Sequence, residues 1–242
     1  MDGNSEPLLS VIIPTKNEEQ HLPACLESAA QQDCTQPWEL IVVDSSCTAA
    51  CGEIAQRYGA RLICEPRPGK GLALVRGSQA ATGEILCFTE ADCRLPTSWL
   101  RTIAGEFEKH PQAVALSGLY TYFDCEKWYN LLCRMALPAS AWLFYLLQRN
   151  HTIRGTNFAV RRWAYWRAGG VNPQACEMQD VELGLRLAQL GTIRLVPAMR
   201  NQTSSRRIRR RMLRFIGESW PAIFRVIVRR QVLTRPTYQD IR

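Results

Sequence analysis

The sequence predicts an α/β protein in which helices flank a mostly parallel β-sheet. Short apolar runs typical of buried strands alternate with segments of helical periodicity over the first 120 residues. Several of the apolar runs end in a polar residue or a proline, as strands do where they leave the core. The chain has 242 residues, 46% of them hydrophobic, which is enough to bury a sizeable core.

The expected elements follow one another as strand, helix, strand, helix. Pro14 should end the first strand, because proline cannot donate to a sheet ladder. Open parallel sheets bind ligands beyond the carboxyl ends of their strands, so polar residues at these ends are candidates for a site. Strands are expected at 9–13, 40–43, 60–64, 85–88 and 113–117, and helices around 22–26, at 53–58, from 71 toward 82 and from 98 onward.

The positive charge of the chain is concentrated at its C-terminal end. From Arg206 onward there are 11 Arg against Glu218 and Asp240, whereas the preceding residues are close to neutral. Apolar residues, among them Phe215 and Trp220, are interleaved with these arginines. We expect a basic amphipathic helical tail over residues 204–242 that binds an anionic membrane surface. A solvated helix docked on the domain is the plainer alternative.

Residues 125–150 contain a strongly apolar stretch with Trp and Tyr, from Leu131 to Leu147. The stretch is short for a membrane span and contains Arg134 and Pro138. It predicts an interfacial or core pair of helices rather than a transmembrane helix, and the sequence does not decide between core and membrane-facing positions.

The ten cysteines show no CxxC pair and no metal-ligand spacing. The N-terminal residues 1–7 are short, polar and acidic, unlike a signal peptide, and we expect them to be flexible. In a chain without a secretion signal, free thiols are expected rather than disulfides, and the expected localisation is cytoplasmic, with a peripheral position on the membrane.

Two carboxylates, Glu90 and Asp92, follow directly on the buried run that begins at Ile85. Two acids one residue apart can turn their oxygens toward one hard cation such as Mg²⁺ or Mn²⁺. Lys70 stands between Gly69 and Gly71 at the start of a predicted helix, where backbone and charge favour a phosphate. Solvated loop acids and a simple turn are the plain alternatives for these features.

Asp180 lies at the start of a predicted helix within MQDVELGLRLAQLG, residues 178–191. The helix dipole favours an ionised carboxylate at this position, which could act as a general base toward a hydroxyl. From the segment alone, a helix-capping role is the simpler interpretation.

Together these motifs resemble family 2 glycosyltransferases of the GT-A fold, which transfer a sugar from a nucleotide diphosphate donor with inversion. Each motif is loose, but five in the right order over 9–196 are specific. They are SVIIPTKNEE (10–19), IVVDSS (41–46), GKGLALVRGSQAATGEILCFTEADC (69–93), GTNFAV (155–160) and QDVELGLRL (179–187).

The resemblance implies a role for each matching residue. Asp180 falls on the catalytic base, and Glu90 and Asp92 fall on the DxD motif, which binds the ribose and the metal-diphosphate. The implied cofactors are Mn²⁺ or Mg²⁺ and a nucleotide-diphospho-sugar, with UDP preferred over GDP. The other implied donor-binding residues are Pro14, Thr15, Asn17 and Glu18 at the base and ribose, Asp44 at the base edge, Lys70 near the base or diphosphate, and Gly155 and Asn157 at the sugar pocket.

The resemblance also implies a division of the chain. Residues 8–203 form the GT-A domain, with a nucleotide-binding half at 8–120 and an acceptor and catalytic half at 121–203. Because the apolar stretch at 131–147 and the basic tail both suit a membrane, the expected acceptor is a lipid or lipid-linked glycan, and a soluble small molecule is the alternative. Nothing resembles the QxxRW motif of processive synthases.

Three departures from the family pattern bear on activity. Glu90 stands where Asp is usual, Gln179 replaces the acid that usually precedes the base, and Ser45 follows Asp44 where a second acid is usual. A catalytically degenerate protein is therefore one alternative. A protein that binds an anionic partner through its arginines is another, although a near-neutral body argues against nucleic acid. A sugar-nucleotide pyrophosphorylase fits less well, because PTKNEE replaces the expected Gly-rich basic loop.

Overall fold

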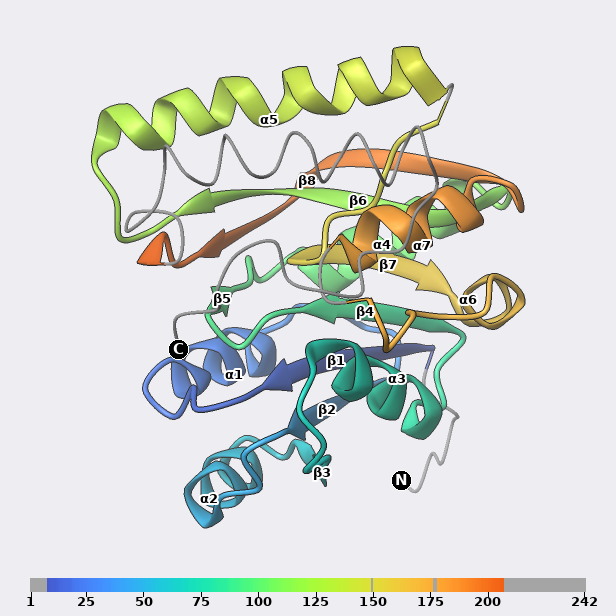
Figure 1. Cartoon of the computed structure of the whole chain (residues 1–242). Helices are drawn as coiled ribbons and strands as arrows, with labels where there is room; N and C mark the ends of the chain where they lie inside the picture. The colour runs from blue at the N-terminus through green and yellow to red at the C-terminus, as the bar shows by residue number, and fades with distance from the viewer. Residues whose placement is uncertain (1–7, 149, 176–177, 207–242) are drawn as a thin grey trace.

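One mixed β-sheet with helices on both faces organises the chain (Figure 1). The computed structural model describes residues 8–148, 150–175 and 178–206. Within these residues eight strands follow the spatial order β3-β2-β1-β4-β7-β6-β8-β5. The pairs β1–β2, β1–β4, β2–β3 and β6–β8 are parallel, and β7 and β5 pair antiparallel with their neighbours. The predicted α/β class with a mostly parallel sheet and flanking helices is confirmed.

The elements alternate along the chain as the sequence predicts, with additional short ones. The strands are β1 (Leu9–Thr15), β2 (Trp38–Asp44), β3 (Arg61–Cys64), β4 (Ile85–Thr89), β5 (Cys93–Arg94), β6 (Ala113–Tyr122), β7 (Asn157–Arg161) and β8 (Thr192–Thr203). The helices are α1 (Leu22–Ala30), α2 (Ala49–Arg57), α3 (Lys70–Ala80), α4 (Trp99–Lys109), α5 (Lys127–Gln148), α6 (Arg162–Arg167) and α7 (Gln179–Leu187).

Alternating side chains of the strands form two cores, one on each face of the sheet. In β4, Ile85 and Cys87 belong to the core beneath α1, α2 and α4, whereas Leu86 and Phe88 belong to the core beneath α3, α6 and α7. All four side chains are at most 3% exposed. A run buried on both faces is what the continuous apolar sequence of this strand predicts.

The first strand does not end at Pro14. Its pairing with β4 stops at Ile12, while its pairing with β2 continues through Pro14 to Thr15. Pro14 therefore has a ladder partner on one side only, which is where a proline is tolerated in a strand. The extension carries Thr15 to the same edge of the sheet as Asp44, its register partner in β2.

Residues 127–148 form the single 22-residue helix α5, with Pro138 inside it, instead of the predicted pair. Pro138 has no N–H, so the carbonyl of Arg134 loses its helical hydrogen bond while the helix continues through the proline. Several large apolar side chains of α5 are exposed, among them Leu131, Met135 and Trp142. The side of the helix that carries them is therefore not part of the protein core. Across the described part of the chain, no helix has the length and hydropathy needed to cross a membrane.

Cys47 and Cys64 form a disulfide, so the expectation of free thiols is wrong for this pair. Asp44 and Cys64 are register partners in β2 and β3, and Cys47 lies three residues after the end of β2. The parallel pairing of two strands thus brings together cysteines that are 17 residues apart, without a spacing motif. Cys51 and Cys93 are free and buried, and burial raises the pKa of each thiol to about 12.

Candidate active site

The strand order reverses at β1, which has β2 on one side and β4 on the other. A crevice at the carboxyl ends of the strands is expected at such a switch point. The segments that leave β1 and β4 here carry Asn17 and Glu18, and Glu90 and Asp92. The sheet therefore brings these predicted site residues to one edge.

Asp92 and Glu18 share one basic partner, Arg206. Its Nη2 atom forms an ion pair with Oε1 of Glu18 and lies 3.5 Å from Oδ2 of Asp92. The hydroxyl of Thr203, at the end of β8, lies 3.5 Å from the other oxygen of Asp92. Both acidic side chains are nearly buried: that of Glu18 is 10% exposed and that of Asp92 is 3% exposed.

A second group forms around Lys70, the first residue of α3. Its Nζ atom forms an ion pair with Oε1 of Glu90. A Cβ atom built on Gly155 would lie 3.5 Å from Nζ of Lys70 and 3.4 Å from Oδ2 of Asp180. The structure thus gathers Lys70, Glu90, Gly155 and Asp180 around one point, although they come from four separate segments.

Asp180 lies in the first turn of α7, as predicted. It is not the capping residue: Met178 holds the capping position, and among the described residues no side chain caps the helix. The Asp180 carboxylate accepts hydrogen bonds from the N–H of Gly155 at 2.7 Å and from the N–H of Val181 at 2.9 Å. Burial lowers the pKa of Arg154, and the charges of Tyr120 and Asp180 act in the opposite direction. Arg154 is thus close enough to Asp180 to be influenced by its charge.

The segments after β1 and β2 are joined by hydrogen bonds. The hydroxyl of Ser46 donates to Oδ1 of Asn17 at 2.7 Å and accepts from its N–H at 2.8 Å. Asn17 has a φ of 54°, a left-handed conformation that asparagine tolerates. The carboxylate of Asp44, only 1% exposed, accepts from the N–H groups of Ser46 and Thr48. Asp44 therefore shapes the loop of the predicted base site, and a role in contacting the base stays a prediction.

The side chain of Asn157 is buried and hydrogen-bonded within the protein core. Its side chain is fully buried, and its amide donates to the carbonyls of Leu119 and Met199 at 2.8 and 2.7 Å. Its Oδ1 accepts from the indole N–H of Trp99 at 2.9 Å. These bonds hold β6, β7 and β8 together, so the Asn157 side chain is engaged within the core of the sheet. Direct contact with a donor, as the resemblance implies, stays a prediction.

The pair Asp92 and Glu18 fits a divalent cation better than the predicted pair Asp92 and Glu90 does. Asp92 and Glu18 both contact a single nitrogen of Arg206, which marks a place for positive charge between two hard oxygen donors. Glu90, predicted to share the ion with Asp92, instead pairs with Lys70. Among the described residues, no group of three acidic, histidine or cysteine side chains is gathered as a metal cage. Mg²⁺ and Mn²⁺ often bind through one or two carboxylates completed by substrate phosphates, so this sparse set still fits.

Arg206 and Thr203 were not expected in the site. Arg206 was assigned to the predicted tail, of which residues 207–242 lie outside the described residues. Its partners Glu18 and Asp92 are 188 and 114 residues away in the sequence, and no local pattern signals such contacts.

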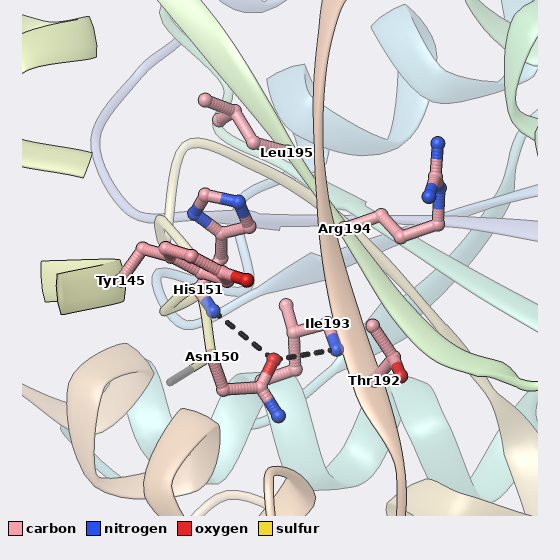
Figure 2. A pocket seen from close by; sticks show the side chains of 7 residues that line it. All are labelled: Tyr145, Asn150, His151, Thr192, Ile193, Arg194 and Leu195. Carbon is pink, nitrogen blue, oxygen red and sulfur yellow. Dashed lines mark hydrogen bonds between the residues drawn. The ribbon is translucent and has the colours of Figure 1, made fainter. Parts of the chain in front are cut away.

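A pocket of about 490 Å³ lies beside the first residues of β8, at the other end of that strand from Thr203 (Figure 2). The rings of Tyr145 and His151 stack there with centroids 5.0 Å apart, and Arg194 points to the other side of β8. Oδ1 of Asn150 accepts from the N–H groups of His151 and Ile193 and fixes the wall. None of the predicted site residues lines it, so the pocket is separate from the candidate active site.

The fold defines an α/β protein with a carboxylate-rich edge at the switch point of its sheet, the usual place for a ligand in such folds. The model of the family "Glycosyl transferase family 2" matches residues 10–169, about two thirds of the chain. The chain belongs to this family, which confirms the resemblance seen in the sequence.

Mycobacterial glycosyltransferases are among its relatives. An uncharacterized glycosyltransferase of Mycobacterium tuberculosis is 34% identical over 101 residues, covering 42% of this chain and 44% of the relative. A PGL/p-HBAD biosynthesis glycosyltransferase of Mycobacterium bovis is 41% identical over 92 residues, covering 36% of each chain. These matches span less than half of the length of the relatives.

Solved structures support the GT-A-like fold over nearly the whole chain. A mannosyltransferase from Pyrobaculum calidifontis in complex with GDP-Man and Mn²⁺ has a TM-score of 0.70 at 22% identity, covering 97% of this chain and 67% of that one. The glucosyl-3-phosphoglycerate synthase of Mycobacterium tuberculosis, in complex with Mn²⁺, UDP and glucosyl-3-phosphoglycerate, has a TM-score of 0.62 at 21% identity, covering 96% and 82%.

Proposed function

We propose that the protein transfers a sugar, with inversion, from a nucleotide-diphospho-sugar to an acceptor hydroxyl. The observation that carries this proposal is the convergence of Lys70, Glu90, Gly155 and Asp180 beside the switch point. Such a site holds a carboxylate to take up a proton and an ammonium group to bind a departing phosphate. Family membership supports the same reaction class.

In this proposal Asp180 accepts the proton of the acceptor hydroxyl while the hydroxyl oxygen attacks the anomeric carbon. The bond from that carbon to the diphosphate breaks on the opposite face, and the nucleoside diphosphate leaves with the bonding electrons. The N–H of Gly155 orients the carboxylate of Asp180. The ammonium of Lys70 lies close enough to contribute positive charge toward the departing diphosphate.

The donor would lie over the edge formed by Pro14, Thr15, Asn17, Glu18 and Asp44, with Asn157 supporting the sugar site from within the core. Asp92 would hold Mn²⁺ or Mg²⁺, which would neutralise charge on the diphosphate. Glu90, which pairs with Lys70, would contribute to the same ion only after leaving that lysine. UDP is the expected nucleotide. Related structures contain either GDP-Man or UDP, each with Mn²⁺.

The acceptor is proposed to be a lipid or lipid-linked glycan. Exposed apolar side chains of α5, among them Trp128, Met135 and Trp142, would lie at a membrane surface, with the arginines after position 206 binding anionic headgroups. The protein would then work as a peripheral protein on the cytoplasmic face. A soluble acceptor remains the alternative.

Calorimetric binding of UDP and GDP, each with and without Mn²⁺, tests the proposal on wild-type protein, Asp92→Ala and the control Asp33→Ala. Asp33 pairs with Arg101 at 3.2 Å instead of with a site residue. We expect metal-dependent binding of one nucleotide that is lost in Asp92→Ala and kept in the control. Absence of binding under every condition would refute a donor site.

One observation favours a degenerate enzyme as the second candidate. Two of the three residues that depart from the family pattern are engaged within the protein: Glu90 with Lys70, and the amide of Gln179 with the carbonyl of Ala175. If the protein is degenerate, wild type binds a nucleotide without turnover, and the double change Glu90→Asp and Gln179→Glu creates turnover. Turnover by wild type would exclude this candidate.

A further inference from the structure

Arg206 reaches from the surface to two nearly buried carboxylates of the candidate site, those of Glu18 and Asp92. Its side chain is 37% exposed, whereas those of Glu18 and Asp92 are 10% and 3% exposed. The same atom, Nη2, contacts both acids, with Oδ2 of Asp92 at 3.5 Å. The nitrogen therefore occupies a point between two carboxylates, where a metal ion with oxygen ligands would also bind.

The position of Arg206 is set by the residues just before it. The hydroxyl of Ser204 and the N–H of Ser205 each donate to the carboxylate of Asp124 at 2.5 Å. Burial by itself raises the pKa of Asp124, but the hydrogen bonds from Ser204 and Ser205 outweigh it and lower the pKa. Asp124 thus remains charged and anchors the chain where it leaves β8, directly before Arg206.

Two nearly buried carboxylates in close proximity repel each other unless a cation lies between them. A guanidinium supplies that charge from within the chain, and a divalent ion would supply it from solution. Two cations held at the same carboxylate repel each other, so binding of one at Asp92 disfavours binding of the other.

We propose that Arg206 is a built-in counter-ion of the donor site, which occupies the cation position when no donor is bound and leaves Asp92 when a divalent ion binds. The inference rests on the proposed donor site and adds a regulation to it. Binding of metal and donor is thus coupled to the position of the Arg206 side chain. A donor with its metal then has to displace an internal ion pair, which lowers the affinity for the metal alone.

The test measures the affinity for Mn²⁺ alone, without nucleotide, from the amplitude of the free Mn²⁺ signal in electron paramagnetic resonance. Arg206→Gln should bind Mn²⁺ about fivefold more tightly than wild type, the effect of losing one partly exposed ion pair. Arg206→Lys, which keeps the charge, should stay close to wild type. Asp124→Asn should shift the affinity in the same direction as Arg206→Gln by a smaller factor, because it loosens Arg206 without removing it.

Arg101→Gln is the matched control, since Arg101 pairs with Asp33 on the surface. Its Mn²⁺ affinity should equal that of wild type. Equal or weaker Mn²⁺ binding by Arg206→Gln, or no Mn²⁺ binding by any variant, would overturn the inference. Calorimetry of UDP and GDP with Mn²⁺ on the same proteins keeps the two proposals apart: retained nucleotide binding leaves the donor site standing even if Arg206 plays no such part.

Discussion

The backbone N–H of Gly155 donates a hydrogen bond of 2.7 Å to Oδ2 of Asp180. This contact joins the turn before β7 to the first turn of α7, two segments 25 residues apart. The second oxygen of Asp180 accepts from the N–H of Val181. A carboxylate fixed by two backbone donors keeps further lone pairs for a proton, which suits a general base.

Replacement of Asp180 by Asn should lower turnover by roughly 10²- to 10⁴-fold, the usual contribution of a general base. Nucleotide affinity should change little, because the change removes a charge from the acceptor side. Release of UDP or GDP from the donor, with water as the acceptor where no other is known, measures the rate. Glu182→Gln is the control, because Glu182 follows on the same helix and pairs with Arg186 at 2.7 Å. Equal losses in both variants would count against Asp180 as the base.

Replacement of Gly155 by Ala should reduce turnover by about tenfold, because the added methyl group would occupy space between two groups that the proposed reaction needs close to the substrate. The new methyl group would lie between Oδ2 of Asp180 and Nζ of Lys70, at 3.4 and 3.5 Å. Stability should change by less than about 0.5 kcal/mol, because these are ordinary contacts. Turnover assays and thermal melts separate the two effects.

The matched glycine for that experiment is Gly105, within α4. A Cβ atom there meets nothing within 4 Å. Gly105→Ala should keep full turnover and raise stability by about 0.5–1 kcal/mol, because alanine suits a helix interior better. A Gly155→Ala protein that turns over as fast as Gly105→Ala would show that the space between Lys70 and Asp180 does not matter.

The sequence predicted those parts of the fold that depend on local pattern. The apolar runs of β1, β2 and β4 are buried on both faces, so their composition marks them directly. The short strand β5 has two residues and no periodicity to detect. The single helix α5 was missed because Pro138 signals a break, whereas the helix continues through it.

Single residues of the candidate site could be predicted from the sequence where they directly follow a strand or begin a helix. Asp92 and Asp180 could be recognised in this way. The partners of these residues could not, because the pairs Arg206–Glu18 and Lys70–Glu90 depend on the strand order of the sheet. The disulfide of Cys47 was missed for the same reason, since it depends on the register between β2 and β3.

Reduction of the disulfide between Cys47 and Cys64 should destabilise the protein. For a loop of 17 residues, chain entropy gives an effect of about 3 kcal/mol. Thermal melts with and without dithiothreitol should therefore differ for wild type and coincide for Cys47→Ser. Cys34→Ser, which changes a free cysteine, should retain the wild-type response. An unchanged wild-type melting temperature under reduction would refute a stabilising disulfide.

Asp124 should contribute stability that depends on pH. Its hydrogen bonds with Ser204 and Ser205 lower its pKa below the unfolded value of about 3.9. The contribution is therefore present above that value and is lost as the pH falls through the lower pKa of the folded state. Asp124→Asn should be less stable than wild type at pH 7, and the difference should shrink toward pH 3. Melting temperatures over this range measure it, and a gap that widens on acidification would contradict the assignment.

The exposed side of α5 should bind to membranes. Trp128, Met135 and Trp142 are 61%, 68% and 64% exposed and recur every seven residues, so they lie along one side of the helix. Such side chains gain roughly 1.5–3 kcal/mol each when fully transferred from water to an apolar environment. The double change Met135→Gln and Trp142→Gln should lower binding to vesicles of phosphatidylserine and phosphatidylcholine by tenfold or more in sedimentation.

Leu62→Gln serves as the control for that experiment, because Leu62 is an exposed apolar residue of β3, at 37%. It should leave vesicle binding unchanged. If the α5 variant binds as tightly as wild type but loses binding at high salt, the arginines after position 206 would carry the attachment alone. Electrostatic attraction is screened by salt, whereas apolar insertion is not, so the two contributions separate in one titration.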